Sequence, residues 1–525
     1  MKKPIKVLAI MLSITALLTA CGGPEKTSVS NTDIDLSSYP VKTDETLTYW
    51  RSLPINISTS VDNFGATEIA QEFERRTGIK IKYQHPAAGQ EKEALNLMIS
   101  ANELPDIINT HWGQYPGGPT RAIDEEVIIP LDAYKEFAPG FFGFLEKNSD
   151  YDKASKTDAG DHYAFVSIQD GNDLLVVSGP AVRKDWLDEL GLEEPKSVDD
   201  WTNMLTAFKE KKGAEAPMSF NYGNICYFFN MFESGFDPYK DGDKIVYAAI
   251  QLEFKNALSI IRDWFEKGLL DKNIVSVDSK LIDNQILNDK TGATITSGGG
   301  GIGQYMKMGV QKNPNFNLTA VPYPSFDGKP TSSVPIAKNI TGVGSAITTQ
   351  AKNPALAAKA LDYFYTEEGD ILANFGIEGV GHTIVDGEPV YTDLIMNNPD
   401  GLTISQALGL HMLAGNGGPF VLDSRYIQQY YGLPQQKAAL KNWTIGFEES
   451  EARRTPMLTY TTEENSEYAQ IMTEVNKYRD QMIVKFINGI EPLENFDKYV
   501  DTMKQLGVER AMEIQTAALK RYQNR

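Results

Sequence analysis

The sequence predicts an α/β fold, and two observations carry that prediction. In the first part of the chain the apolar residues alternate between the spacing of a strand and the spacing of a helix. The chain also has 525 residues, 41% of them hydrophobic, which is enough to bury a large core and favours two or more domains. Strands that alternate with helices form mostly parallel sheets, whose ligands bind beyond the carboxyl ends of the strands.

The alternation begins near residue 45. Residues 47–53 (LTYWRSL) are predicted to form a strand, and residues 67–77 an amphipathic helix that Gly78 ends before a second strand. In residues 91–113 a second helix stops at Leu104 and Pro105, and a buried strand follows that ends at Trp112. The expected order is therefore strand, helix, strand, helix and strand.

Several motifs along the chain resemble one family. The segment PDII with an aromatic residue shortly after it, and then IIPLDAY, RKDWLDELGLEEP, KTGATITSGG and NPALAAKALDYFYTEEGDILANFG, follow one another in that order. This order resembles the extracellular solute-binding proteins of family 1, which serve sugar-import ABC transporters. The total length and the long C-terminal tail resemble more narrowly the large oligosaccharide-binding lipoproteins related to the alginate-binding proteins.

The resemblance implies two α/β lobes of the periplasmic-binding-protein type, class II, joined by a hinge that the chain crosses three times. Residues 45–165 with 325–375 would form the first lobe, and residues 170–320 with 400–525 the second lobe and its C-terminal helices. A carbohydrate, most simply an oligosaccharide, would bind between the lobes of a monomer and pass to an ABC permease without chemical change. A receptor for peptides or other small solutes, a sensor for a signalling partner, and an exported carbohydrate-active enzyme are the alternatives.

The amino terminus predicts export and a lipid anchor. Lys2, Lys3 and Lys6 precede an apolar run too short for a comfortable membrane span, and LTAC at residues 18–21 resembles a bacterial lipobox. Residues 1–20 would then be a signal peptide, Cys21 the lipid attachment site, and residues 21–44 a flexible tether. This places the protein on the outer face of the cell membrane of a Gram-positive bacterium. An ordinary secretory signal with a chance cysteine is the alternative.

Composition limits the partners. The net charge is −20, and it would be −23 without the three lysines of the leader, so nucleic acid and anionic lipid are not expected partners. Apart from Cys21 the chain has one cysteine, Cys226, which sits among aromatic residues and is expected to be packed and inert. No internal disulfide is expected.

Motifs for catalysis and metal binding are lacking in the sequence. The five histidines have no paired spacing, and neither G-x-S-x-G nor G-x-x-x-x-G-K occurs. Large members of the family have a calcium loop at the position where this chain has Lys211, Lys212 and Gly213. The segment FDPYKDGDKIVY, which is the other candidate for a calcium loop, is better explained as a hairpin with an Asp-Gly turn. We therefore expect no metal and no cofactor.

The glycine-rich run SGGGGIGQYM contains G-x-G-x-x-G, but it lies at mid-chain and in an exported protein, so a dinucleotide site is not expected. It is predicted either to let a bulky ligand approach the backbone at the cleft or to be a loop without a ligand.

A sugar site needs an aromatic plane beside groups that hydrogen-bond hydroxyls. Trp112 and Tyr115, which follow the third strand, are the first candidates for the plane, and Tyr222 and Tyr227 the next. The remaining candidates are aromatic residues near expected strand ends and polar residues in loops: Trp50, Tyr305, Trp443, Asp170, Asn172 and Arg425. For each aromatic candidate, packing in the core is the alternative, and for each polar one exposure to solvent. Trp186, Trp201 and Trp264 have helical spacing and are expected in the core.

Overall fold

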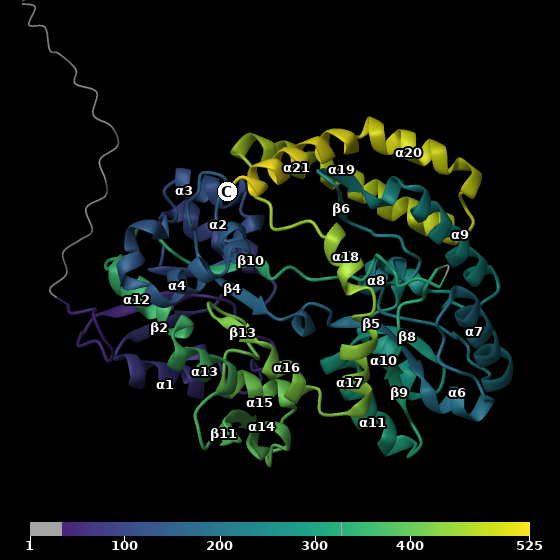
Figure 1. Ribbon diagram of the computed structural model, residues 1–525, viewed down its shortest axis with the longest axis horizontal. Helices are drawn as coiled ribbons and strands as arrows, with labels where there is room; N and C mark the ends of the chain where they lie inside the picture. Colours follow the sequence, from purple (N-terminus) through teal and green to yellow (C-terminus); the bar gives the residue numbers. More distant parts are fainter. Residues whose placement is uncertain (1–33, 327) are drawn as a thin grey trace, which may run out of the picture.

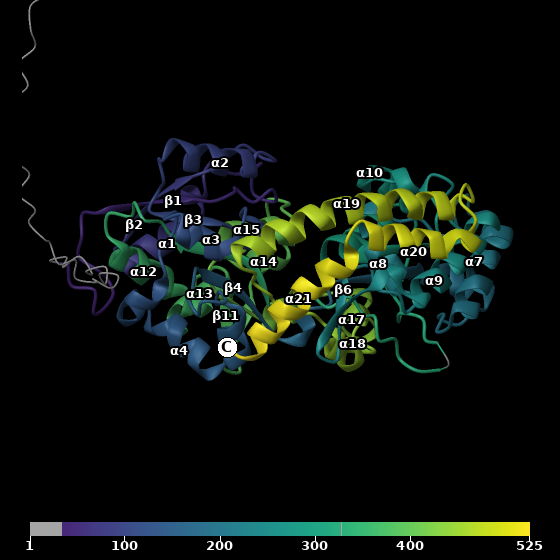
Figure 2. The same ribbon diagram turned by 90° about the horizontal axis from the view of Figure 1, so that it is seen from above.

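The computed structural model describes residues 34–326 and 328–525. Two lobes, each with its own sheet and hydrophobic core, lie side by side, and the long C-terminal helices run along the second lobe towards the first (Figures 1 and 2). The predicted signal peptide, Cys21 and the beginning of the tether lie outside the described residues. The end of the predicted tether is not a flexible segment: Leu36 and Val41 are buried in the core of the first lobe, and the Val41 N–H donates to the Thr77 carbonyl at 2.7 Å. Among the helices of the described residues, none combines the length and the apolar character that a membrane span requires.

A six-stranded sheet forms the centre of the first lobe. Strands β1, β2 and β3 are parallel, as the alternating sequence pattern predicts, while β10 runs antiparallel to both of its neighbours. The strands in spatial order are β13 (Val421–Asp423), β4 (Phe165–Asp170), β10 (Ile340–Ile347), β3 (Ile107–His111), β1 (Thr46–Trp50) and β2 (Lys80–Gln84).

Local signals fix the first helix, α1 (Glu68–Thr77). The Thr67 side chain accepts a hydrogen bond from the backbone of Ala70 and caps the helix, and Gly78 ends it with a φ of 70°. A side chain at Gly78 would collide with the backbone carbonyl of Val41, so both the angle and the space require glycine. Ile69 and Phe73 on the inner face are buried in the core of the lobe.

The other helices of the first lobe cover the faces of this sheet (Figure 1). They are α2 (Glu91–Ala101), α3 (Gly118–Asp124), α4 (Pro139–Lys147), α5 (Ser149–Ala154), α12 (Pro354–Asp362) and α13 (Glu367–Phe375). A small cluster with its own apolar contacts follows: the hairpin β11 (His382–Val385) and β12 (Glu388–Tyr391), then α14 (Asp393–Met396), α15 (Ile404–His411) and α16 (Ser424–Tyr430).

The second lobe is built on a three-stranded antiparallel sheet in the order β8-β5-β9. Trp186, Trp201 and Trp264 are buried in its core, which confirms that prediction. The strands are β5 (Ser178–Arg183), β8 (Ala293–Ser297) and β9 (Leu318–Ala320), and the helices are α6 (Lys184–Leu190), α7 (Val198–Lys212), α8 (Ile225–Asn230), α9 (Leu252–Glu266), α10 (Ser279–Leu287) and α11 (Gln304–Lys312).

Two sequence details of this lobe have the expected local structure. FDPYKDGDKIVY forms the hairpin β6 (Pro238–Asp241) and β7 (Lys244–Tyr247), with Gly242 at a φ of 59° in its turn. Lys211 and Lys212 end α7, and Gly213 caps it in the left-handed region. The segment that would have to supply a calcium loop is therefore a helix end.

The C-terminal part of the chain divides between the lobes. β13 joins the sheet of the first lobe, so residues 400–423 do not lie with the second lobe as we expected for the whole of 400–525, whereas Ile427 of α16 is buried in the core of the second lobe. The reason is that β13 pairs in parallel with β4, an interaction that the short segment VLD does not reveal in the sequence. The remaining helices extend the second lobe: α17 (Pro434–Asn442), α18 (Phe447–Arg453), α19 (Thr462–Ile487), α20 (Phe496–Gln505) and α21 (Val508–Gln523).

Three segments connect the lobes: the links from β4 to β5, from β9 to β10 and from α16 to α17. The first two are joined to each other, because the Ala337 N–H donates to the Leu175 carbonyl and the Gln169 N–H to the Asn339 carbonyl, both at 2.8 Å. At the end of α21, the Arg525 guanidinium donates to the backbone carbonyls of Lys153 in α5 and Lys156 just after it. The C-terminus therefore forms a further contact between the lobes.

Candidate functional site

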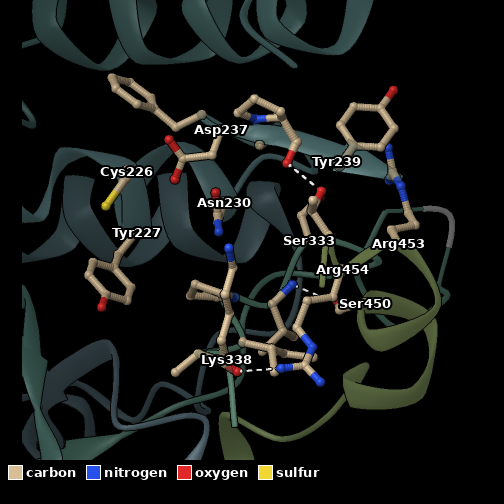
Figure 3. Close-up of a pocket in the computed structure, with 18 of the residues that line it drawn as sticks. Cys226, Tyr227, Asn230, Asp237, Tyr239, Ser333, Lys338, Ser450, Arg453 and Arg454 are labelled. Carbon is tan, nitrogen blue, oxygen red and sulfur yellow. Dashed lines mark hydrogen bonds between the residues drawn. The ribbon is translucent and has the colours of Figure 1, made fainter. Parts of the chain in front are cut away.

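A cavity of about 460 Å³ lies where the connecting segments meet the second lobe (Figure 3). It is enclosed by α8, by the chain leading into β6, by the link between β9 and β10, and by the end of α18. Its size is within the range that binds small organic ligands. The side chains that carry its polar character are Tyr227, Asn230, Asp237, Tyr239, Ser333, Lys338, Ser450, Arg453 and Arg454.

Helix α8 supplies one wall. Cys226, Tyr227 and Asn230 line the cavity because they share one side of this short helix, while Phe228 and Phe229 on its other side are buried in the core. Tyr227 and Cys226 are only partly buried, and burial raises the pKa of both groups. Both side chains are therefore neutral at physiological pH. The Oδ1 atom of Asn230 is buried without a hydrogen-bond partner.

Two arginines at the end of α18 form the opposite wall, and both are held in place. Arg453 lies over the ring of Tyr239, with 4.1 Å between its Cζ atom and the ring centroid, and donates to the Ser332 hydroxyl at 2.7 Å. Arg454 donates to the Ala337 carbonyl at 2.8 Å and to Glu451 at 2.6 Å.

Lys338 projects into the cavity from the link between β9 and β10 (Figure 3). Its pKa is lowered, first because the amine is desolvated by burial and second because Arg454 lies nearby. Among the described residues no hydrogen bond or ion pair to its Nζ atom is found.

A second cavity of about 600 Å³ adjoins the first and shares Lys338 and Arg454 with it. Its walls come from α4 and α5 of the first lobe and from α21 of the C-terminal helices. Tyr151 is the aromatic residue of the first-lobe wall, where its hydroxyl donates to Asp170 at 2.9 Å. Together the two cavities form a continuous polar space between the lobes, with Lys338 and Arg454 at its middle.

Five aromatic residues that were candidates for the sugar site lie in the core instead. The indole N–H of Trp112 donates to the Gly344 carbonyl at 3.1 Å, and that of Trp443 to the Pro180 carbonyl at 3.0 Å. The hydroxyls of Tyr115 and Tyr305 are bound to Glu125 and Asp283. All five rings are packed, and the polar side-chain atoms of these four are satisfied, so these residues offer no plane to a ligand. The five are Trp50, Trp112, Tyr115, Tyr305 and Trp443.

The polar candidates lie at the surface, away from the first cavity. Arg425 is paired with Asp423 and Glu388, and Asp170 lies on the same side of the sheet, in a shallow hollow with Asp423. Asn172 is exposed in a turn, and Tyr222 is partly buried outside the cavity wall. Of the ten candidates for ligand binding, the structure places Tyr227 alone on that wall.

The glycine-rich run forms a helical turn, Gly298–Gly303, that the chain itself covers. A Cβ atom at Gly298 would lie 2.5 Å from the Tyr431 hydroxyl, and one at Gly299 2.7 Å from the ring of Tyr430. The close approach that these glycines allow is therefore to residues of α16 and its end. No ligand is needed to explain them.

Sequence reasoning missed the residues that give the cavity its charge, Lys338, Arg453 and Arg454. The signal that could have found Lys338 is its position, because it closely precedes β10 in a segment that connects the lobes. Arg453 and Arg454 lie at the end of α18, just before the segment that leads to α19, and nothing in the sequence there marks a connection between lobes. Asp237 also lines the cavity, but the sequence draws attention to it only as part of the calcium-loop candidate FDPYKDGDKIVY.

Two α/β lobes joined by several crossing segments, with a polar cavity at the junction, define a solute-binding protein of the two-lobed kind. The chain belongs to the bacterial extracellular solute-binding protein family, whose pattern matches residues 63–371. The predicted family and the predicted two-lobe fold are confirmed.

Relatives with known roles are similar over most or part of the chain. The chain is 24% identical to the fructooligosaccharide ABC transporter substrate-binding protein FusA of Streptococcus pneumoniae, over 99% of this chain and 98% of that protein. It is 25% identical to the melibiose/raffinose/stachyose-binding protein MelE of Bacillus subtilis, over 53% of this chain and 62% of that protein. The lipoprotein LipO of Bacillus subtilis is 22% identical over 62% of this chain and 66% of its own length.

Solved structures of similar fold include two of the large members. The alginate-binding protein AlgQ2, in a structure without calcium ion, superposes with a TM-score of 0.73 at 22% identity, over 91% of this chain and 99% of that one. FusA of S. pneumoniae in complex with kestose superposes with a TM-score of 0.70 at 21% identity, over 91% of this chain and all of that one. The predicted likeness to the large oligosaccharide-binding subgroup is confirmed.

Proposed function

We propose that this protein captures an oligosaccharide outside the cell, in the polar space between its lobes, and delivers it to an ABC permease without changing it chemically. The observation that carries the proposal is the cavity at the junction of the lobes, with Tyr227 and a set of hydrogen-bonding groups on its walls. An aromatic ring beside such groups is what recognition of a sugar requires. The full-length similarity to a fructooligosaccharide-binding protein supports the same class of ligand.

The proposed cycle is a closure of the lobes. A ligand that contacts both walls binds the closed state more tightly than the open state and therefore shifts the population towards closure. The monomer in its closed form is then what the permease recognises. The connecting segments that are joined at Ala337 and Leu175 are the proposed hinge.

The experiment is a calorimetric titration of the purified chain with a panel of neutral and acidic oligosaccharides, and with peptides of similar mass as controls. The expected result is saturable binding of an oligosaccharide, a ligand-dependent rise in melting temperature, and recovery of the ligand unchanged. Binding of peptides but not of oligosaccharides would assign the chain to another class of receptor. Release of shortened sugar products would contradict a role without catalysis.

We also propose that Cys21 carries the lipid that anchors the protein to the outer face of the membrane. Support comes from the leader sequence and from the similarity to a lipoprotein. Cys21→Ser is expected to release the protein into the medium, because a leader without the cysteine cannot receive the acyl chains that give stable attachment. The oligosaccharide affinity of the released protein should be unchanged, since Cys21 precedes Leu36 and Val41, the residues at which the chain packs into the core of the first lobe.

A further inference from the structure

The amine of Lys338 has no hydrogen bond and no ion pair among the described residues, and the one charge that favours its protonated form is the exposed carboxylate of Asp237 across the cavity. Arg454 beside it is bound to Glu451 and to the Ala337 carbonyl, and Arg453 to Ser332 and the ring of Tyr239. A desolvated charge without a counter-ion destabilises a fold unless something else binds it.

The charge of the interlobe space is opposite to that of the whole protein. The chain has 70 acidic and 50 basic side chains, but the two cavities together are lined by five basic and three acidic ones. The basic residues are Lys147, Lys240, Lys338, Arg453 and Arg454, and the acidic ones Asp150, Asp237 and Glu451. A positive cleft in a strongly negative protein concentrates anions at that one place.

We infer that the oligosaccharide bound by this protein carries an anionic substituent on one of its sugars, a carboxylate as in a uronate, and that Lys338 binds it. This inference rests on the proposed function and narrows its ligand class. A carboxylate in the cavity supplies the direct ion pair that Lys338 does not make with Asp237, and Arg454 adds a second positive charge nearby.

The groups that face Lys338 from the other walls fit this role. On α8 the nearest polar group is Asn230, whose Oδ1 is unpartnered and whose amide can donate to a ligand oxygen. Ahead of β6, the exposed carboxylate of Asp237 faces the same cavity, and Glu451 at the end of α18 is already bound by Arg454. Asp237 is the group that would repel an anion, so it sets where the carboxylate cannot lie.

The test compares matched ligands that differ only in charge. Trimers and tetramers of galacturonate, mannuronate and glucuronate are titrated in a calorimeter beside their methyl esters, in which the same rings carry no charge. We expect at least one oligouronate to bind with a Kd about tenfold or more below that of its ester. A sulfated neutral trisaccharide is included to distinguish a sulfate ester from a carboxylate.

Variants then assign the effect to Lys338. Lys338→Met keeps the length of the side chain and removes the charge, and is expected to weaken oligouronate binding about tenfold or more while ester binding changes by less than about twofold. The matched control is Lys498→Met on the exposed face of α20, which makes the same change in net charge far from the cavity. Asp237→Asn is expected to strengthen oligouronate binding.

The outcomes separate this inference from the proposed function. If neutral oligosaccharides bind as tightly as uronates, the anionic ligand is excluded and the proposed function stands. If Lys338→Met leaves oligouronate affinity within twofold of wild type, the assignment of the carboxylate to Lys338 is overturned. If a sulfated sugar binds and uronates do not, the carboxylate assignment is overturned. If no carbohydrate of either charge binds, the proposed function itself fails.

Discussion

Two regions of this protein supply aromatic candidates for the sugar site and have opposite environments. In the loop after β3, Trp112 and Tyr115 are packed and every polar atom of their side chains is bound within the protein. On α8, Tyr227 is partly open to a cavity whose neighbouring polar atoms include unpartnered ones in Asn230 and Lys338. The two regions therefore differ in whether the aromatic ring is packed in the core or partly open to a cavity, which the aromatic residue type alone does not reveal.

The largest expected effect in a test of this comparison comes from removing the packed indole ring of Trp112. Trp112→Ala should destabilise the protein by about 3–5 kcal/mol, because it leaves a large cavity and an unpaired Gly344 carbonyl. Chemical denaturation with fluorescence detection measures the loss. At a temperature where the variant is folded, its oligosaccharide affinity should equal that of the wild type. A stable Trp112→Ala variant with reduced oligosaccharide affinity would show that Trp112 belongs to the binding site.

Removing the ring of Tyr227, which is partly open to the cavity, should instead reduce ligand affinity and leave the stability of the fold nearly unchanged. Tyr227→Ala is expected to reduce oligosaccharide affinity about tenfold, or roughly 1.4 kcal/mol, since a sugar loses its apolar plane while the fold loses only a partly exposed side chain. Calorimetry measures the affinity and thermal denaturation the stability. Tyr227→Phe is the control, because it keeps the ring and should keep most of the affinity. An unchanged Kd for the alanine variant would argue against stacking on Tyr227.

A third test concerns an acidic hollow that is outside the proposed site. Burial, and then the charge of Asp423, raise the pKa of Asp370 to about 7, although Arg425 and the Asn374 amide act in the other direction and Asp170 adds repulsion. The folded protein therefore holds a proton that the unfolded chain releases near pH 4, so this group makes stability fall as the pH rises from about 4 to 7.

Asp370→Asn should remove that contribution. Its melting temperature relative to wild type is expected to increase between pH 4.5 and pH 8, with no effect on ligand affinity. Asp501→Asn on exposed α20 is the matched control and should give a constant difference. A difference for Asp370→Asn that does not change with pH would show that the carboxyl group is already ionised in the folded state.

The smallest expected effect is on the unliganded protein. Because burial lowers the pKa of Lys338, its charge opposes folding at neutral pH, and Lys338→Met should raise the melting temperature slightly in the absence of sugar. Differential scanning calorimetry detects the change. A decrease would mean that the amine already has a stabilising partner, and would weaken the contrast between the cavity and the core.

Local signals in the sequence predicted much of the fold. The capped helix between Thr67 and Gly78 and the Asp-Gly hairpin at Gly242 depend on neighbours within a few residues, and each was predicted from them. The parallel unit of β1, β2 and β3 pairs residues far apart in the chain, and it was predicted from the alternation of strand and helix patterns. The position of β13 was not predicted, because it depends on pairing with a strand about 250 residues earlier in the chain.

The sequence alone determined the family, the alternation of strands and helices and the overall negative charge, because these follow from local order and composition. Tertiary structure decided which aromatic residues are open to the cavity and which are packed in the core. Trp112 and Tyr227 are both candidates for the sugar-binding plane from their surroundings in the sequence. Only the packing of β10 against the loop after β3 gives the indole N–H of Trp112 a hydrogen-bond partner, the Gly344 carbonyl. It also decided the charge of the cavity, since Lys338 and Arg454 are 116 positions apart and meet only because the link between β9 and β10 lies beside the end of α18.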